Sequence, residues 1–394
     1  MANDPPLIER PIVCTPSDLS ALTKDLRAAG RFALDTEFLG ERTYVPKLCL
    51  VQVATKDFIA LVDTIAVKDI SPLWELISDN TIEKVLHAAR EDLRLAYYGG
   101  GKLEPRNIFD TQVAGGLVGL PQYPLSYGRL VDALIGVKLS KAETRSEWDR
   151  RPLTPEQFRY ARDDVRYLLP VADKLSNVLT RLGRIEWMNE EMSRFSDPAV
   201  YEPDPEIAYL RVRGPRAGLT ARPTALLRAV AAWREREAAD RDVPARTILR
   251  DEALTELALR GPRHLTEFIK LRNFPAGEET TLGPGILAAL NAGRTLNEGD
   301  LPVALVGQDE DTPQQRTLAD LVCAIGSAIC LETNIAPELA ITKTSSSDLT
   351  RGDLSSPLLT GWRYSALGNT LQAFAAGSSP ISLEVIDGVL KVAS

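Results

Sequence analysis

The residues with the clearest potential for chemistry are four acids and one tyrosine in the first half of the chain. Asp35 and Glu37 stand two apart, Asp92 follows a later apolar segment, and Asp164 stands four residues after Tyr160. Acids that share a site repel one another, and burying them costs stability unless a cation or a proton offsets their charge. Carboxylate oxygens are the ligands that Mg²⁺ and Mn²⁺ prefer in proteins. Each motif alone is common on solvated strands and helices, so the prediction that these residues share one site rests on their combination.

The pair Asp35 and Glu37 lies in a predicted strand, whose two-residue period sends both side chains to one face. Three strands are predicted in succession, at residues 31–37, 48–54 and 58–62. Strands and helices then alternate: a helix opened by Ser71-Pro72, a strand at 84–88, a helix at about 90–98 that begins near Asp92, a strand ending at Asp110 and a helix at 111–118. This succession predicts an α/β domain with a mixed sheet.

Tyr160 and Asp164 lie in a helix whose start is well marked. Thr154 can cap it, Pro155 fits its first turn, and Gln157 completes a capping box. We expect this helix to run to about residue 182, with the tyrosine and the acid on one face. Residues 197–223 hold several prolines and glycines and predict a linker, after which two helical regions follow, at about 224–292 and 314–376.

Composition narrows the classes of protein that fit. A chain of 394 residues predicts two or three domains. No apolar run is long enough to span a membrane, and the first residues lack the pattern of a signal peptide, so we expect a cytoplasmic protein. Two histidines exclude a multi-histidine metal centre, and four scattered cysteines argue against a zinc site or a disulfide framework. The net charge of −8 argues against a broad nucleic-acid-coating surface, although residues 138–166 carry a cluster of lysines and arginines.

The longer sequences that contain these motifs resemble ribonuclease D, within the DEDD superfamily of exonucleases. The resemblance spans about residues 10–195 and rests on Leu34-Asp-Thr-Glu-Phe38, Tyr44-x-Pro-x-Leu-x-Leu-x-Gln52, Leu86-His-Ala-x-x-Glu-Asp-Leu93, Phe109-Asp-Thr-Gln112, Ser146-x-Trp-x-x-Arg-Pro-Leu153 and Tyr160-Ala-x-x-Asp-Val-x-Tyr-Leu-Leu-Pro170. It implies a ribonuclease H-like exonuclease domain that hydrolyses RNA from the 3′ end and releases nucleoside 5′-monophosphates.

The resemblance also implies roles for the five residues. Two divalent ions, Mg²⁺ or Mn²⁺, would activate a water and neutralise the leaving oxygen, held by Asp35, Glu37, Asp92 and Asp164. Tyr160 would orient that water or help to deprotonate it. A variant of the superfamily has a histidine five residues before the last acid, where this chain has Arg159, so the tyrosine class follows.

Substrate contacts are expected from a second set of residues: Thr36, Phe38, His87, Lys141, Arg145 and Trp148. For His87, a structural role beside the strand is an equal alternative. For the basic segment before Tyr160, a solvated loop is the alternative, and phosphate contact is the preferred interpretation. Gln52, Asp110 and Gln112 are expected to support the site or the fold.

The second half of the chain resembles HRDC domains, which are small helical bundles. The match is carried by residues 224–258 and, for a divergent second copy, by Ala336-Pro-Glu-Leu339 and Gly361-Trp-Arg363. We expect an exonuclease domain at 1–196, a linker at 197–219, an HRDC domain at 220–296, a divergent HRDC-like domain at 312–378 and a tail at 379–394. Residues 196–394 carry 20 Lys+Arg against 26 Asp+Glu. We therefore expect the two helical bundles to form walls that restrict access to the active site, rather than to bind RNA strongly on their own.

The expected substrate is structured RNA with a single-stranded 3′ end, above all tRNA precursors, bound by a monomer that needs no membrane. Every candidate ligand precedes residue 196, so a chain ending near residue 215 is expected to keep the chemistry. A DNA exonuclease of the same fold stays open, because the sequence does not locate a reader of the 2′-hydroxyl. A catalytically inactive RNA-binding scaffold is disfavoured, because all four acids and the tyrosine are present.

Overall fold

The computed structural model describes residues 7–40, 42–140, 146–214, 217–305 and 312–393. The chain divides into two compact units. The first unit comprises residues 1–38, 48–198 and 312–394, and the second comprises 39–47 and 199–311. No helix in the described part of the chain is both long and apolar enough to cross a membrane.

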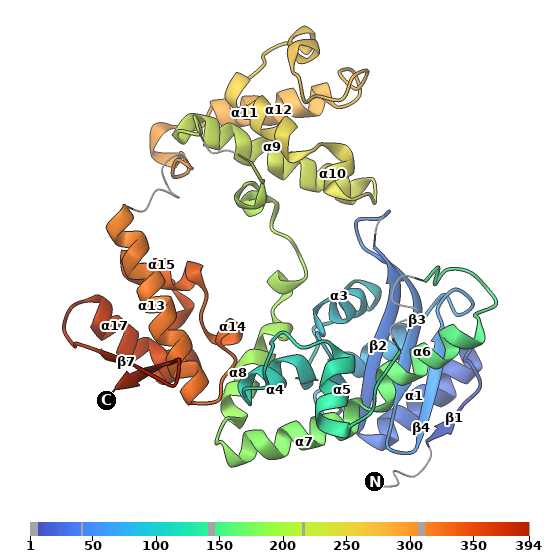
Figure 1. Cartoon of the computed structure of the whole chain (residues 1–394). Helices are drawn as coiled ribbons and strands as arrows, with labels where there is room; N and C mark the ends of the chain where they lie inside the picture. The colour runs from blue at the N-terminus through green and yellow to red at the C-terminus, as the bar shows by residue number, and fades with distance from the viewer. Residues whose placement is uncertain (1–6, 41, 141–145, 215–216, 306–311, 394) are drawn as a thin grey trace. The chain divides into compact units, whose positions relative to one another are not determined.

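The first unit contains a six-stranded sheet, of which β1 to β4 are labelled in Figure 1. Its strands are β1 (Ile8–Glu9), β2 (Arg31–Leu39), β3 (Lys47–Ala54), β4 (Phe58–Asp63), β5 (Glu83–Leu86) and β6 (Ile108–Asp110), in the order β1-β4-β3-β2-β5-β6. The β3–β4 pair is antiparallel, whereas β1–β4, β2–β5 and β5–β6 are parallel. The predicted mixed sheet is confirmed.

Helices surround this sheet within the first unit: α1 (Pro16–Ala29), α2 (Ser71–Ser78), α3 (Arg90–Gly99), α4 (Thr111–Leu117), α5 (Tyr127–Ile135), α6 (Pro155–Arg166), α7 (Leu168–Arg181) and α8 (Ile185–Ser193). Helix α6 packs against β4 and α7 against β5. The capping box predicted for α6 is present: Gln157 N–H donates to Thr154 Oγ1, and Thr154 N–H donates to Gln157 Oε1.

The expectation of one continuous helix from Pro155 to about residue 182 is wrong. Helix α6 ends at Arg166 and α7 begins at Leu168. Pro170 has no N–H to donate to the carbonyl of Arg166, and its ring would clash with that carbonyl in a continuous helix. The break therefore follows from a proline four residues downstream.

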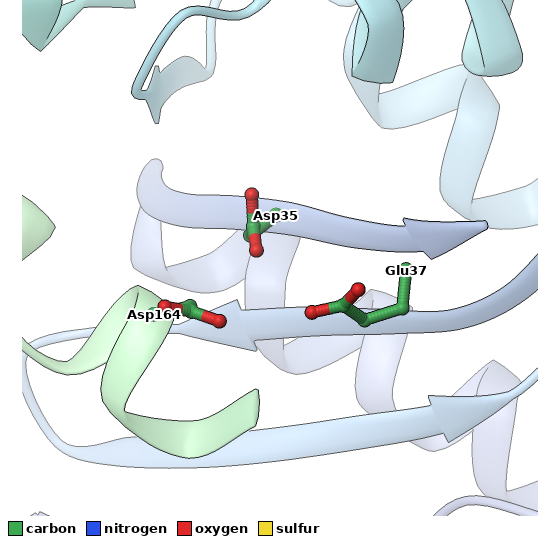
Figure 2. Close-up of side chains that lie close together, drawn as sticks. All are labelled: Asp35, Glu37 and Asp164. Carbon is green, nitrogen blue, oxygen red and sulfur yellow. The ribbon is translucent and has the colours of Figure 1, made fainter. Parts of the chain in front are cut away.

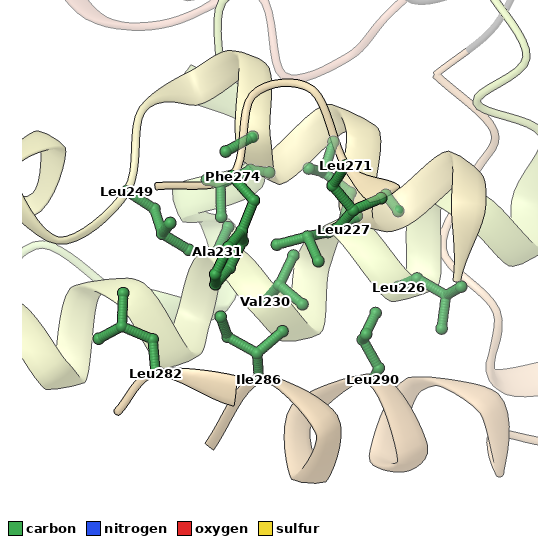
Figure 3. Packing of buried hydrophobic residues seen from close by; sticks show 14 of the residues in the cluster. Leu226, Leu227, Val230, Ala231, Leu249, Leu271, Phe274, Leu282, Ile286 and Leu290 are labelled. Atoms are coloured by element: carbon green, nitrogen blue, oxygen red, sulfur yellow. The ribbon is translucent and has the colours of Figure 1, made fainter. Parts of the chain in front are cut away.

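The second unit is helical, with α9 (Ala221–Asp240), α10 (Ala245–Ile248), α11 (Asp251–Arg260) and α12 (Gly283–Arg294). Figure 3 shows leucines, Val230, Ile286 and Phe274 from these helices and their connections meeting in one apolar core. The short 3-10 helix Pro205–Arg211, within the segment expected as a linker, packs on α9 and places Ala208 in this core.

The last part of the chain groups with the first unit. It forms α13 (Pro313–Glu332), α14 (Pro337–Ala340), α15 (Lys343–Arg351), α16 (Gly361–Arg363), the π-helix Tyr364–Gly368, α17 (Asn369–Ala375) and a hairpin of β7 (Ser382–Ile386) and β8 (Val389–Ala393). Further 3-10 helices are Arg194–Ser196, Pro198–Val200, Leu265–Lys270, Glu298–Asp300 and Pro357–Leu359.

A buried polar joint connects this C-terminal part to α4 and α8. The Arg184 guanidinium donates to the carbonyls of Leu117, Thr333 and Asn334. On α8, Glu191 accepts from Trp362 Nε1 at 2.8 Å and from Arg363 Nη1 at 2.5 Å. Burying these polar and charged groups without partners would cost free energy, so the C-terminal part and helices α4 and α8 stabilise each other.

Candidate active site

Three carboxylates from β2 and α6 converge in the first unit. Asp35, Glu37 and Asp164 each offer an oxygen, and these three oxygens lie within 4.8 Å of one another. Figure 2 shows Asp164 on α6 facing the acid pair, and both members of the pair come from β2. On β2, Phe32 and Leu34 are fully buried, whereas Asp35 and Glu37 are half-buried.

Asp92 lies in the first turn of α3 and is buried. It is not part of the three-oxygen cluster found among the described residues, but its charge repels Asp35 and Glu37. Its Oδ1 accepts a hydrogen bond from Thr36 Oγ1 at 2.5 Å. Thr36, expected to contact substrate, thus has its hydroxyl committed to an acid of the site.

The turn that presents Asp92 is held by Asp110 at the end of β6. The two carboxylate oxygens of Asp110 accept the N–H groups of Ala88 at 3.0 Å and Ala89 at 2.9 Å, and one of them also accepts Gln112 N–H at 2.8 Å as the cap of α4. Ala88 has a φ of 56°, a left-handed conformation that costs energy for a residue with a Cβ. Asp110 therefore stabilises a strained entry into α3.

Burial raises the pKa of all four acids, and repulsion from other acids adds to this effect. Burial, followed by the charges of Asp92, Asp164 and Glu37, holds the pKa of Asp35 well above its ordinary value. Burial and the charges of Asp164 and Asp92 raise the pKa of Glu37 to about 9. Burial raises the pKa of Asp92 to about 7, against the opposing bond from Thr36, and that of Asp164 also to about 7. The four acids cannot all ionise near neutral pH without positive charge between them.

The donor set fits a divalent cation. All candidate ligand atoms are carboxylate oxygens, the type that hard cations prefer. In addition, Asp164 Oδ2 is buried and has no hydrogen-bond partner among the described residues. A buried acceptor left unmatched costs about 1–3 kcal/mol, and a bound cation would remove that cost.

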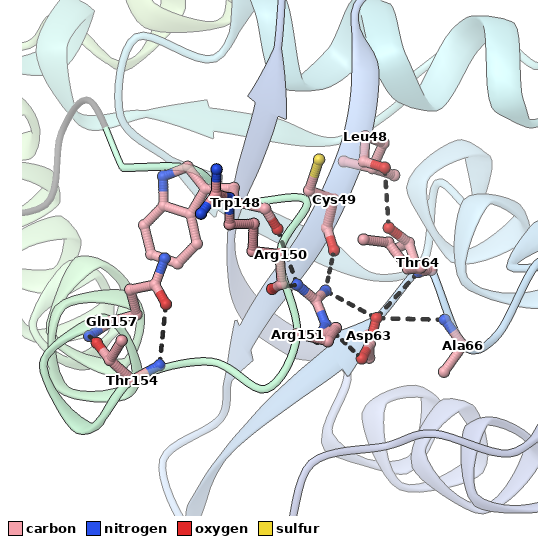
Figure 4. Close-up of polar contacts among 11 residues, drawn as sticks. Leu48, Cys49, Asp63, Thr64, Ala66, Trp148, Arg150, Arg151, Thr154 and Gln157 are labelled. Atoms are coloured by element: carbon pink, nitrogen blue, oxygen red, sulfur yellow. Dashed lines mark hydrogen bonds and ion pairs between the residues drawn. The ribbon is translucent and has the colours of Figure 1, made fainter.

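The segment before α6 is anchored to the sheet by Arg151. Figure 4 shows its guanidinium reaching the carboxylate of Asp63 at the end of β4 and the carbonyls of Cys49 and Trp148. Burial alone would raise the pKa of Asp63, but its bonds with Arg151 and with two main-chain N–H groups lower it below the ordinary value. Arg151, counted in the basic segment, is therefore a structural residue.

This anchor places Trp148 beside Tyr160. Their ring centroids lie 6.0 Å apart, with the planes tilted by 40°. Trp148, expected to contact substrate, is 2% exposed, so packing against the tyrosine is its main observed role. Its indole N–H is buried and has no partner among the described residues. Tyr160 itself is half-buried on α6, one helical turn before Asp164.

His87 joins three segments near the site. Its Nε2 lies 3.0 Å from the Leu125 carbonyl and its Nδ1 lies 3.0 Å from Thr111 Oγ1. Burial lowers its pKa, so the ring is neutral at pH 7. Because a carbonyl only accepts, Nε2 carries the proton, and the Thr111 hydroxyl beside Nδ1 also lies 3.0 Å from the Leu86 carbonyl, to which it can donate. Both nitrogens are engaged within the fold, which supports the structural alternative over substrate contact.

The remaining expected substrate contacts are placed only in part. Phe38 is half-buried on β2. Lys141 and Arg145 lie outside the described residues. Sequence reasoning missed Tyr127, whose hydroxyl bonds main-chain groups on both sides of Asp164. No motif marks it, because its partners are backbone atoms 36 and 40 residues away.

Comparison with known proteins identifies two regions. A family model described as 3′-5′ exonuclease matches residues 11–180, and a model described as HRDC domain matches residues 224–290. The chain is 39% identical over 372 residues to ribonuclease D of Gluconacetobacter diazotrophicus, covering 93% of each protein. It is 35% identical to ribonuclease D of Sphingobium indicum, covering 97% of this chain and 98% of that one.

A solved structure agrees with these sequence matches. The crystal structure of Escherichia coli RNase D, described as an exoribonuclease involved in structured RNA processing, superposes with a TM-score of 0.82 at 29% identity. The match covers 93% of this chain and 98% of the other.

Proposed function

The chain belongs to the ribonuclease D family and is a 3′→5′ exoribonuclease, and on that premise we propose that its active site is built from Asp35, Glu37, Asp92, Tyr160 and Asp164. The observation that carries the proposal is the convergence of three carboxylates from β2 and α6 within 4.8 Å, with Asp92 close enough to repel two of them. Enzymes of this class need divalent cations. We assign two, Mg²⁺ or Mn²⁺, to the four acids.

The proposed reaction is hydrolysis of the last phosphodiester bond. A water attacks the terminal phosphorus, the bond to the 3′ oxygen of the preceding nucleotide breaks, and a nucleoside 5′-monophosphate leaves. Divalent cations, when bound, supply the positive charge that activates this water and offsets charge on the leaving oxygen. The carboxylates of β2, α3 and α6 hold that charge in place. The Tyr160 hydroxyl orients the water, and the buried Trp148 ring fixes the tyrosine ring.

We propose that the natural substrates are structured RNAs with a single-stranded 3′ end, in particular tRNA precursors, and that the protein acts as a monomer. Support comes from the E. coli relative, which is described as processing structured RNA and matches across nearly the whole chain. A DNA exonuclease of the same fold is the competing outcome. The 2′-hydroxyl distinguishes the two substrates, because it can donate and accept hydrogen bonds that DNA lacks.

The second unit has a basic cavity suited to an RNA backbone, although the second half of the chain is acidic. The cavity measures about 490 Å³ and is lined by Arg246, Thr247, Ile248, Leu249, Arg250, Glu252, Arg272, Asn273 and Pro275. Arg246 is paired with Asp251, but neither the Arg250 nor the Arg272 guanidinium has a partner among the described residues, although the main-chain N–H of Arg272 donates to Glu256. Unpaired guanidiniums bind phosphate oxygens well. We propose that these two arginines hold the body of a large RNA.

One experiment tests the proposal. Purified protein with Mg²⁺ is given a 3′-extended tRNA, a short single-stranded RNA and a DNA of the same sequence, and the products are separated by length. We expect stepwise shortening of both RNAs from the 3′ end, with 5′-monophosphates released and the tRNA trimmed to its body. The Asp35→Asn protein is the control for contaminating nucleases. Faster degradation of the DNA, or activity that survives in the Asp35→Asn protein, would contradict the assignment.

A further inference from the structure

The break between α6 and α7 contains an inserted side chain. The Tyr127 hydroxyl donates to the Asp163 carbonyl at 3.1 Å and accepts the Tyr167 N–H at 3.1 Å. In a continuous α-helix these two main-chain groups, four residues apart, would bond each other directly. The hydroxyl therefore replaces one rung of the helical hydrogen-bond ladder, which is a known cause of helix kinks.

Pro170 disrupts the helix at this point, and the Tyr127 hydroxyl bonds main-chain groups at the same break. The proline leaves the Arg166 carbonyl without its helical donor and pushes the chain apart there. How far the last turn of α6 swings then depends on what satisfies the other freed groups. Tyr127 satisfies the carbonyl of Asp163 and the N–H of Tyr167, which lie on either side of Asp164.

Tyr127 is itself held rigidly. It occupies the first position of α5, and its ring lies 5.7 Å from the ring of His87 at a tilt of 53°. His87 is in turn bonded to Thr111 on α4 and to the Leu125 carbonyl. Burial, together with the nearby charges of Asp164 and Asp35, raises the pKa of Tyr127 well above its ordinary value, so the hydroxyl keeps its proton and its donor role.

We propose that Tyr127 is a positioning residue: its hydroxyl fixes the last turn of α6 and so keeps Asp164 in register with Asp35 and Glu37. The inference rests on the proposed function, in which these carboxylates hold the divalent cations. It goes beyond that function because it makes a tyrosine that touches none of the reacting atoms responsible for the position of Asp164 relative to the other carboxylates. Misplacing a catalytic group by about 1 Å can cost roughly 10²-fold in rate.

The test compares wild type with Tyr127→Phe, which keeps the ring and removes only the hydroxyl. Binding of Mn²⁺ alone is measured by calorimetry, and kcat and KM are measured on a short single-stranded RNA. We expect Mn²⁺ affinity to fall about 10-fold and kcat to fall roughly 10- to 100-fold, while KM changes less than about 3-fold. Tyr209→Phe, in the second unit, is the matched control, because its hydroxyl has no partner among the described residues. It should match wild type in all three quantities.

A second comparison separates this inference from the proposed function. Asp164→Asn should abolish activity and weaken Mn²⁺ binding more than Tyr127→Phe does. If Asp164→Asn were active, the proposed site would be wrong. If Asp164→Asn were inactive while Tyr127→Phe bound Mn²⁺ and turned over like wild type, only the positioning role would be overturned.

Hydrogen exchange on the wild-type protein gives a readout that does not depend on how well the variant folds. The Tyr167 amide should be protected in the metal-free protein to the same degree as amides inside α7, because the Tyr127 hydroxyl accepts it in addition to the Val165 carbonyl within the same turn. Fast exchange of this amide, with α7 protected, would overturn the proposal even if Tyr127→Phe could not be purified.

Discussion

Replacing Asp110 by alanine should both destabilise the protein and slow catalysis, although this residue binds no substrate in the proposed mechanism. Its carboxylate accepts the N–H groups of Ala88, Ala89 and Gln112 at 2.8–3.0 Å. Leaving the first two donors unpaired costs about 1–3 kcal/mol each, and losing the cap of α4 costs about 1 kcal/mol. We therefore expect a loss of about 3–7 kcal/mol in the free energy of unfolding.

The effect on rate follows from the same contacts. Without Asp110, the bonds that it makes to the Ala88 and Ala89 N–H groups are lost, and we expect the turn at the left-handed Ala88, which leads into α3, to relax. Asp92 then moves relative to the other acids, and a displacement of about 1 Å predicts a loss near 10²-fold in kcat. Asp110→Asn keeps one acceptor oxygen and should lose roughly half as much stability.

Urea unfolding of the metal-free protein measures the first quantity, and single-turnover cleavage of a short RNA measures the second. Thr15→Ala is the control, because Thr15 caps α1 by accepting the Asp18 N–H, away from the acids. It should cost about 1 kcal/mol and leave kcat unchanged. The reasoning fails if Asp110→Ala loses less than about 1 kcal/mol, or if it loses stability and keeps the wild-type rate.

Four further predictions address the site and the second unit. Asp35→Asn and Asp164→Asn should each lower kcat by orders of magnitude with the fold intact, and EDTA should abolish wild-type activity; circular dichroism and a cleavage assay test both statements. Tyr160→Phe should lower kcat by about 10²–10⁴-fold with little change in RNA affinity, since only the hydroxyl that meets the water is lost, and a gel shift beside a rate measurement checks this. The pKa of each of the four acids is raised, to about 7 for Asp164, so the folded metal-free protein binds more protons than the unfolded chain, and its Tm should fall as pH rises from about 4 to 7. Addition of Mn²⁺ should raise Tm more at pH 8 than at pH 5.5. A Tm that rises between pH 4 and pH 7 would contradict the burial of these acids. Reversing the charge of Arg250 and Arg272 to glutamate should weaken binding of a tRNA precursor and change its stopping points, yet leave cleavage of a short RNA unaffected, as affinity and product-ladder measurements would show.

The parts of the site that were predictable depend on local geometry. The two-residue period of a strand was enough to place Asp35 and Glu37 on one face, and the capping box was enough to start α6 at Pro155. The four-residue spacing placed Tyr160 and Asp164 one turn apart. Each of these relations involves residues close in sequence, so backbone period alone decides them.

The parts that were missed depend on contacts between distant residues and main-chain atoms. Pro170 was visible in the sequence, yet the helix was expected to continue through it to about residue 182. The Tyr127 hydroxyl and the Asp110 carboxylate find backbone partners that no side-chain motif records. Thr36 was expected to meet substrate, and for His87 substrate contact and a structural role were equal alternatives; the polar atoms of both residues bond groups inside the fold.

Several arginines of the basic segment, and of the helix that follows it, have structural partners in the fold. Arg151 is bound to Asp63 and to main-chain carbonyls, and Arg162 and Arg166 both pair with Glu9 at the start of the sheet. A count of lysines and arginines cannot tell a phosphate-binding surface from a set of structural ion pairs, because both need the same residues. Only the geometry of the partners separates them.

The same lesson applies to where the catalytic part of the chain ends. All candidate ligands precede residue 196, which led to the expectation that a chain ending near residue 215 keeps the chemistry. The structure argues against this, because such a chain would leave the Arg184 guanidinium without two of its carbonyl partners and Glu191 without Trp362 and Arg363. Met192, next to Glu191 on α8, accepts the N–H of Asp110, so a disturbance of α8 reaches the residue that holds the turn before Asp92. We therefore expect the C-terminal helices to support the active site through their contacts with α8, at a distance that no motif in the first 195 residues could reveal.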